Sequence, residues 1–286
     1  MVGIARVRTG LAVAIAVLLV GDAALLYLHA PAHAVTVDSA VRRYRAAAAQ
    51  PEATQPDAGA APVVPVDTAP AKQAPTRTQP AIGGAAERPG LPPPKNGVYT
   101  YDTSGFEQTD AVGGARHDYP AQTTITVRPE GCGWVEHWQP LDERWDDVDL
   151  CTKDDAWALV GVKTFHEFFH QTQEQDSTCD PGAIYLPQPS SFTCGGSFGA
   201  MKFTAQVIGR EDVAVGANAT SGLHVHYAVE FTGSNRGSGT YDEWTAANGA
   251  LLQRIWDMHI VTDSPFGTVH YDEHYKITLT SMDPKT

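Results

Sequence analysis

The stretch Leu223-His-Val-His-Tyr-Ala-Val-Glu-Phe231 decides the fold of this chain, because a large apolar residue stands at every second position. Side chains of a strand point alternately to its two faces, so the pattern predicts a strand with one buried face. Similar segments, rich in Val, Ile, Thr, Tyr, Phe and Trp, lie on both sides of it. They are Gln122–Val127, Cys132–Trp138, Trp157–Lys163, Met201–Ile208, Leu251–Val261 and Val269–Leu279.

Turn signals separate these segments at intervals of about 8–12 residues, as in sandwiches and barrels. They include Pro129-Glu130-Gly131, Asp180-Pro181-Gly182, Gly216-Ala217-Asn218, Gly233-Ser234-Asn235, Asn248-Gly249 and Ser264–Gly267. No long apolar stripe at helical period interrupts the series. The sequence therefore predicts an all-β domain over residues 96–286, an antiparallel meander forming a curved sheet, a half-barrel or a sandwich. The exposed face of such a sheet is a natural site for an elongated apolar ligand.

The N-terminus carries an export signal. Arg6 and Arg8 precede the apolar run Leu11–Leu28, which is close to the length that crosses a bilayer core of about 30 Å. We predict a cytoplasmic segment (1–10) and a transmembrane anchor (11–30), hence a single-pass protein of the cell membrane with its C-terminal domain outside. The alternative is a signal peptide cleaved after Ala32-His33-Ala34, which would release a secreted domain.

Two further segments separate the membrane from the β domain. Val37, Val41 and Tyr44 stand at helical spacing, and Asp38 or Ser39 would cap the helix, so we expect a short juxtamembrane helix over 36–48. Residues 49–95 are rich in Pro and Ala and nearly free of aromatics, which predicts a disordered linker. Its expected role is to space the domain from the membrane.

The charge is unevenly distributed. Of 20 Lys and Arg and 33 Asp and Glu, nine and six fall in residues 1–95, which leaves 11 basic and 27 acidic side chains for the rest. So acidic a domain repels nucleic acid. The expected partners are the membrane, through the N-terminal segment, and a lipid, cell-wall or surface-protein ligand.

All four cysteines lie in the predicted β domain, an even number behind an export signal, as expected where disulfides persist. We predict the pairs Cys132–Cys151 and Cys179–Cys194, because each brackets a short segment that contains a turn. A disulfide closing a loop of 15 to 20 residues gains about 3 kcal/mol in the chain-entropy model.

Three segments carry a resemblance: Gly97–Tyr101 with Gly113–Pro120, Cys132-Gly-Trp134 with Leu141–Trp145, and Val269–Pro284. With these, the chain resembles a group of uncharacterised membrane-anchored proteins of high-GC Gram-positive bacteria. The resemblance implies the location and layout given above and no activity. The terminal hairpins are also similar to those of LolA-like lipoprotein carriers, whose half-open barrels hold acyl chains.

The motif most suggestive of catalysis is His166-Glu-Phe-Phe-His170, which matches the His-Glu-x-x-His pattern of zinc metalloproteases. On a helix, His166 and His170 would ligate zinc and Glu167 would act as general base. Asp176 falls where extended zincins place a third ligand. However, Gln173 stands where that extended motif needs Gly, and the preceding residues 159–165 favour a strand. In a strand the two histidines would lie some 13 Å apart, too far to share one zinc ion.

A second histidine set has the spacing of a strand. His224 and His226 are two residues apart, and His270 and His274 flank Asp272, so each set projects from one strand face. Neighbouring strands could join them into a metal site, with solvated surface histidines as the alternative.

Two other patterns have structural explanations. The acidic run Asp142–Asp149 could ligate Ca²⁺ but lacks the spacing of a calcium loop, so we expect a strand edge guarded by charge. Six tryptophans could form a ligand platform, and we expect most of them in the core.

No complete catalytic set is present in the sequence. The leading hypothesis is a non-catalytic, membrane-tethered, extracytoplasmic β domain without a cofactor, which binds an apolar or envelope-related ligand or scaffolds a surface protein. The alternative hypothesis is the zinc metalloprotease.

Overall fold

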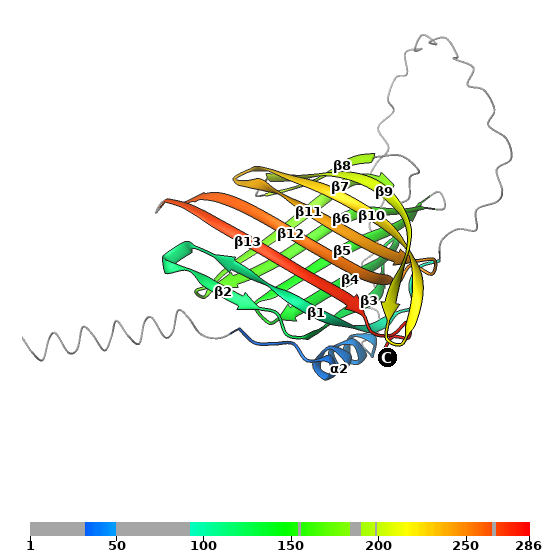
Figure 1. Cartoon of the computed structure of the whole chain (residues 1–286). Coiled ribbons are helices and arrows are strands. Elements are labelled where there is room, and N and C mark those ends of the chain that lie inside the picture. The colour runs from blue at the N-terminus through cyan, green and yellow to red at the C-terminus, as the bar shows by residue number, and fades with distance from the viewer. Residues whose placement is uncertain (1–31, 50–91, 154–155, 184–189, 198, 265–266) are drawn as a thin grey trace, which may run out of the picture.

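The structure is a computed structural model that describes residues 32–49, 92–153, 156–183, 190–197, 199–264 and 267–286. Its strands form a closed antiparallel barrel of 12 strands (Figure 1). The prediction of an all-β antiparallel domain is confirmed. The closed barrel replaces the curved sheet, half-barrel or sandwich that the sequence left open.

The strands follow one another around the barrel in chain order. They are β1 (Gly97–Thr109), β2 (Ala115–Asp118), β3 (Gln122–Glu130), β4 (Gly133–Leu141), β5 (Arg144–Lys153), β6 (Ala156–Phe168), β7 (Gln171–Ala183), β8 (Ser190–Gly196), β9 (Gly199–Val215), β10 (Asn218–Gly233), β11 (Asn235–Ala246), β12 (Leu251–Ser264) and β13 (Gly267–Leu279). A short 3₁₀ helix, η1 (Ala111–Gly113), joins β1 to β2.

Closure depends on β1. One side of this strand pairs with β13, from Tyr101↔Leu279 to Thr109↔Tyr271. The other side pairs with β3 along the first half of β1 and with β2 along the second half. A closed barrel leaves no full-length strand edge exposed, which protects a sheet of this size from edge-to-edge association.

The alternation in the sequence sets the inner and outer faces of the wall. In β10 the side chains of Val225, Tyr227, Val229 and Phe231 are buried inside the barrel. The intervening His224 and His226 lie on the outer face, where both contact Asp242 of β11. The strand that decided the fold class therefore also fixes which residues face the lumen.

The two ends of the barrel differ. One end is filled by buried side chains, among them Trp134, Trp157 and Leu252. The tip of the long β9–β10 hairpin, drawn yellow, runs across this end near the C-terminus (Figure 1). Gly216 at the tip has φ +58°, and a Cβ there would lie 2.8 Å from the carbonyl oxygen of Thr280, so this turn requires glycine. The opposite end carries the β6–β7 and β10–β11 turns.

The helix α2 (Val37–Ala48) packs on the outside of the barrel wall, where Ala40 and Val41 form a small apolar cluster with Val98 of β1. Its cap is Thr36, whose hydroxyl accepts a hydrogen bond from Ser39 N, instead of the predicted Asp38 or Ser39. Arg45 donates two hydrogen bonds to the carbonyl oxygen of Thr286. The helix therefore belongs to the folded domain, and residues 50–91 connect two parts of that domain instead of spacing it from the helix.

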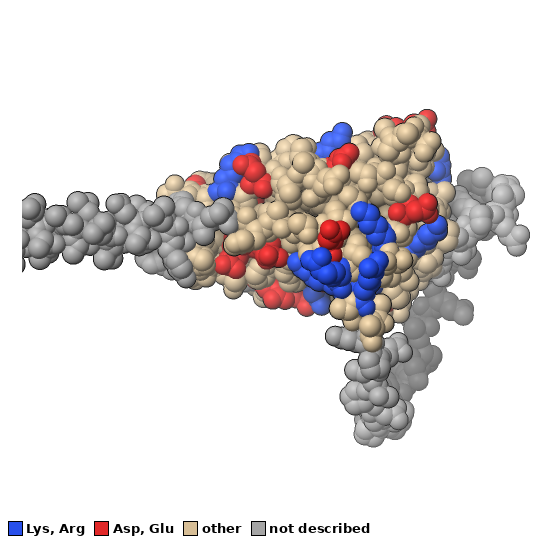
Figure 2. All heavy atoms as spheres, turned by 90° about the horizontal axis from the view of Figure 1, so that it is seen from below, with Lys and Arg blue, Asp and Glu red and all other residues tan. Residues whose placement is uncertain are grey.

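Seen from below, basic and acidic side chains are mixed on the surface of the domain (Figure 2). Arg43 of α2 contacts Asp142 at 3.4 Å, and Lys95 contacts Asp283 at 2.9 Å. These contacts hold α2 and the residues before β1 to the barrel.

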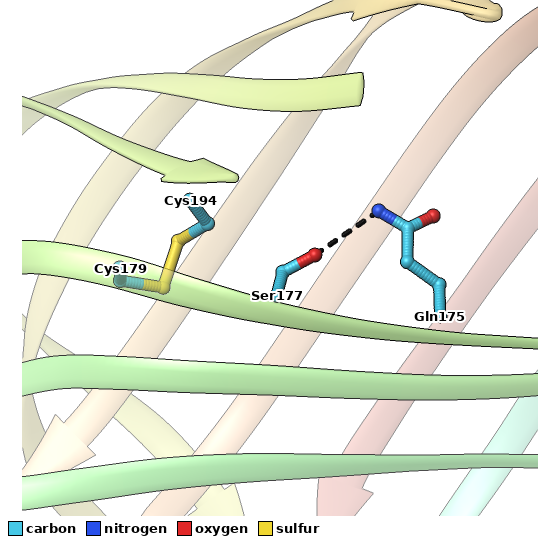
Figure 3. The surroundings of a disulfide bond; sticks show 4 residues. All are labelled: Gln175, Ser177, Cys179 and Cys194. Carbon is cyan, nitrogen blue, oxygen red and sulfur yellow. Dashed lines mark hydrogen bonds between the residues drawn. A yellow bond between two sulfur atoms is a disulfide. The ribbon is translucent and has the colours of Figure 1, made fainter. Parts of the chain in front are cut away.

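Both predicted disulfides are present, Cys132–Cys151 and Cys179–Cys194. The second joins β7 to β8 directly across a register pair (Figure 3). Disulfides persist in oxidising compartments, which indicates an extracytoplasmic location for the domain.

The predicted anchor (11–30) and most of the linker lie outside the described residues. Within the described part of the chain, no helix is long and apolar enough to cross a membrane. The strand pairing that closes the barrel lies within residues 97–279, and the barrel surrounds one continuous core. Residues 32–286 therefore have the properties of a unit that folds by itself.

Candidate functional site

The lumen contains a cavity of about 570 Å³, which extends to the end of the barrel that carries the β6–β7 and β10–β11 turns. Its two sides differ in chemistry. One wall, from β6, β8, β9 and β10, is apolar and includes Val162, Phe192, Met201, Phe203 and Phe231. The facing wall, from β5, β11, β12 and β13, includes Arg144, Asp146, Glu243, Arg254 and Glu273.

Arg144 organises the first polar cluster. Its guanidinium donates bidentate hydrogen bonds of 2.6 and 2.7 Å to Asp146 and bonds of 3.0 and 3.3 Å to Glu273. A third carboxylate, Glu107, lies 3.8 Å from Arg144 Nε. Glu107 and Glu273 stand opposite each other in the β1–β13 register, so Arg144 neutralises a like-charged cross-strand pair.

Glu107 is fully buried yet held ionised. Burial acts to raise the pKa of its carboxyl, but contacts from His117 Nδ1 at 2.8 Å and His166 Nδ1 at 2.9 Å, with the charge of Arg144, lower that pKa to about 2. The Tyr271 hydroxyl donates a further bond of 2.9 Å. Glu107 thus accepts three hydrogen bonds in the barrel interior, as a buried carboxylate requires.

Arg254 organises a second, looser cluster. Its Nη2 atom lies 3.4 Å from Glu136 and 3.3 Å from Glu243. Burial raises the pKa of the Glu136 carboxyl from 4.5 to about 7, against the opposing charge of Arg254. Tyr241 donates its hydroxyl to Glu243. The two clusters together place five carboxylates against two guanidinium groups.

The pKa of Glu136 predicts a pH dependence of stability. Since the pKa is raised on folding, the folded protein keeps a proton that the unfolded chain loses between pH 4.5 and about 7, so stability falls as the pH rises through this window. We expect Glu136→Gln to reduce the fall in Tm between about pH 5 and pH 8. Thermal unfolding at several pH values measures this, with the exposed Glu230→Gln as control. Equal pH dependence in the wild type and Glu136→Gln would contradict the assignment.

Two hydrogen-bond donors beside the cavity lack an acceptor. Within the described residues, Arg254 Nε and Trp256 Nε1 are buried and have no hydrogen-bond partner. Both residues line the cavity and stand two positions apart on β12, so they share the inner face. An unsatisfied buried donor costs about 1–3 kcal/mol, so an acceptor that reaches these two groups gains a favourable hydrogen bond.

The zincin-like motif lies in a β-hairpin instead of a helix. His166 is in β6 and lines the cavity, where it contacts Glu107. His170 is in the β6–β7 turn with φ +57° and lies 3.4 Å from Glu167. Asp176 is on β7 and contacts Lys163 at 3.7 Å. The structure therefore does not bring the three predicted zinc ligands together on the face of one helix.

The second histidine set is divided over the outer wall. His224 and His226 share Asp242, at 2.8 and 2.9 Å, whereas His270 contacts Asp110 at 2.7 Å and His274 contacts Asp257 at 3.3 Å. Strands β11 and β12 separate the two pairs. Among the described residues, no group of three or more His, Cys, Asp or Glu is arranged to hold a metal ion.

The acidic run is not a guarded strand edge. Strand β5 pairs with β4 on one side and β6 on the other, and its alternation places Arg144 and Asp146 in the cavity wall. The tryptophans divide among three environments. Trp134, Trp138, Trp157 and Trp244 are buried, Trp244 being stacked on His224, whereas Trp256 lines the cavity and the half-buried Trp145 stacks on Phe165 on the outer face.

Comparison with known proteins identifies no relative: no family model, curated protein or solved structure matches the chain. The cavity is therefore interpreted from its own geometry and chemistry.

Proposed function

We propose that the barrel is a non-catalytic binding domain that holds an apolar ligand in its lumen. The observation that supports this most strongly is the cavity of about 570 Å³ with an apolar wall of Val162, Phe192, Met201, Phe203 and Phe231. Small-molecule sites typically have volumes of about 300–1,000 Å³, are mainly apolar and contain a few oriented polar groups. Phe and Met side chains on one wall suit a flexible apolar chain, because Met adapts its shape to a ligand.

We prefer a binding function to the activity of a zinc peptidase. A zincin needs its two histidines one helical turn apart on one face. Here His166 points to the lumen, where it helps to hold Glu107, and His170 lies in the turn that follows the strand. His166 thus has a structural role in the polar wall.

The setting favours a ligand from the cell envelope. We propose that residues 11–30 anchor the chain in the membrane with the barrel outside. His33 contacts Glu143 at the β4–β5 turn through its backbone N at 2.8 Å and its ring at 2.6 Å. Between residue 30 and His33 the chain can span at most about 11 Å. The barrel would therefore stand at the membrane surface, within reach of envelope lipids.

Direct binding of a fluorescent probe tests the proposal. We expect residues 32–286 to bind the neutral probe N-phenyl-1-naphthylamine with enhanced fluorescence. Met201→Trp, which fills the cavity from β9, is expected to weaken this binding about tenfold or more, since it removes volume next to the apolar wall.

Lys202→Trp is the matched control, because Lys202 is the adjacent residue and is exposed on the outer face. Thermal unfolding of both variants verifies that they are folded. Absence of probe binding to the wild type, or equal loss in the two variants, would refute a lumenal site.

A further inference from the structure

The polar wall of the cavity indicates the class of ligand. Three carboxylates, Asp146, Glu243 and Glu273, line the cavity beside Arg144 and Arg254. Asp146 and Glu273 already accept four of the five N–H donors of Arg144, which leaves a single Nη1 N–H for an anionic head group. An anion such as a fatty-acid carboxylate would enter a wall that already holds more negative than positive groups, at a cost that the two paired guanidinium groups do not offset.

The same excess of carboxylates attracts a cation, but a cation does not satisfy the donors of this wall. The unsatisfied groups beside the cavity are N–H donors, Arg254 Nε and Trp256 Nε1, and a cation leaves both without an acceptor. Arg254 is nine-tenths buried or more, with 4% of its side chain exposed, and its contacts with Glu136 and Glu243 are long, at 3.4 and 3.3 Å. Both unpaired atoms have almost no accessible surface, so a small rotation of the Arg254 guanidinium and of the Trp256 ring is needed to direct Nε and Nε1 to a ligand.

We propose that the lumen selects an uncharged amphiphile whose hydrogen-bond-accepting oxygen, such as an ester, amide or ketone carbonyl, is received by Arg254 Nε and Trp256 Nε1. The apolar body of this ligand lies against Phe192, Met201 and Phe203 on the facing wall. This inference rests on the proposed lumenal site and adds the chemistry of its polar contact.

A series of ligands with the same chain length tests the proposal. Dodecane and methyl dodecanoate, each below its solubility limit, and dodecanoic acid and dodecylamine, each below its critical micelle concentration, compete with N-phenyl-1-naphthylamine for residues 32–286. The ester is expected to bind about tenfold more tightly than the alkane, because one hydrogen bond to a previously unpaired donor is worth about that factor. It is also expected to bind more tightly than the acid and the amine.

Two variants locate the contact. Trp256→Phe keeps an aromatic ring but removes the donor, and Arg254→Lys keeps the charge that faces Glu136 and Glu243 but removes Nε. Each is expected to reduce the preference for the ester over the alkane to about twofold or less, with little change in alkane affinity. Trp244→Phe is the matched control, because its Nε1 donates to Glu211 on the outer face.

The outcomes separate the two proposals. If the probe binds but the ester and the alkane compete equally, or the acid or amine competes best, the polar contact is refuted and the lumenal site stands. If the preference for the ester persists in Trp256→Phe and Arg254→Lys, these residues are not the donors. If neither probe nor ligands bind, the lumenal site itself is refuted.

Discussion

Replacing Arg144 with Met is expected to lower the free energy of unfolding by about 3–5 kcal/mol, the cost typical of removing one partner of a buried ion pair. The variant would leave Glu107, Asp146 and Glu273 facing one another in the barrel interior without a cation. Met fills much of the same volume, so the loss would come from the unpaired charges. Equilibrium unfolding in urea at neutral pH measures the change.

Arg236→Met provides the matched control. Arg236 also pairs with a carboxylate across strands, Asp263 at 2.8 Å, but both side chains are more than half exposed. Exposed ion pairs contribute about 0–1 kcal/mol, so this variant should remain close to the wild type. A loss in Arg144→Met no larger than in Arg236→Met would show that the buried carboxylates do not depend on Arg144.

The sequence predicted the wall of the barrel better than its closure. Alternation in Leu223–Phe231 and in Val269–Leu279 correctly identified β10 and β13 and the face that each buries. The pairing of β13 with β1 joins residues about 170 positions apart, and no local pattern encodes a contact of that range. Whether a meander closes into a barrel was therefore decided only by the structure.

The buried carboxylates Glu136 and Glu273 were missed because each is hidden within an apolar pattern. Glu136 stands between Trp134 and Trp138, and Glu273 stands between Tyr271 and Tyr275. Both glutamates occupy the alternate positions of their strands whose side chains face the interior. Side chains two positions apart in a strand lie on the same face. A charged residue therefore faces the interior when the aromatic residues two positions before and after it face the interior. This signal was present, but its partner Arg144 comes from another strand and could not be assigned from spacing.

The histidine motifs show why the zinc site remained only the alternative hypothesis. His166 and His170 match a metal pattern whose geometry exists only on a helix, whereas Val162 and Thr164 before them continue the alternation of β6. Secondary structure thus determines whether a spacing has chemical meaning. His166 nevertheless belongs to the cavity wall, through its contact with Glu107.

The two disulfides are expected to stabilise different parts of the molecule to a similar total extent. Their loops span 19 residues for Cys132–Cys151 and 15 for Cys179–Cys194, so the chain-entropy model assigns about 3 kcal/mol to each. Their surroundings differ. Within the described residues, β7 and β8 pair only from Ser177↔Gly196 to Cys179↔Cys194, and β7 continues past the end of β8 (Figure 3).

We therefore expect Cys179→Ser with Cys194→Ser to open the barrel wall locally between β7 and β8, in addition to lowering global stability by about 3 kcal/mol. Hydrogen exchange measured by mass spectrometry should show lost protection in β7 and β8, with β12 and β13 unchanged. Cys132→Ser with Cys151→Ser should lower global stability to a similar extent without this local opening, because β4 and β5 remain paired from Gly133↔Cys151 to Trp138↔Asp146. Since Gln173 and Gln175 of β7 line the cavity, the opened wall should also release a bound probe faster. Unchanged exchange in β7 and β8 after loss of Cys179–Cys194 would show that the few backbone pairs hold the wall closed without the disulfide.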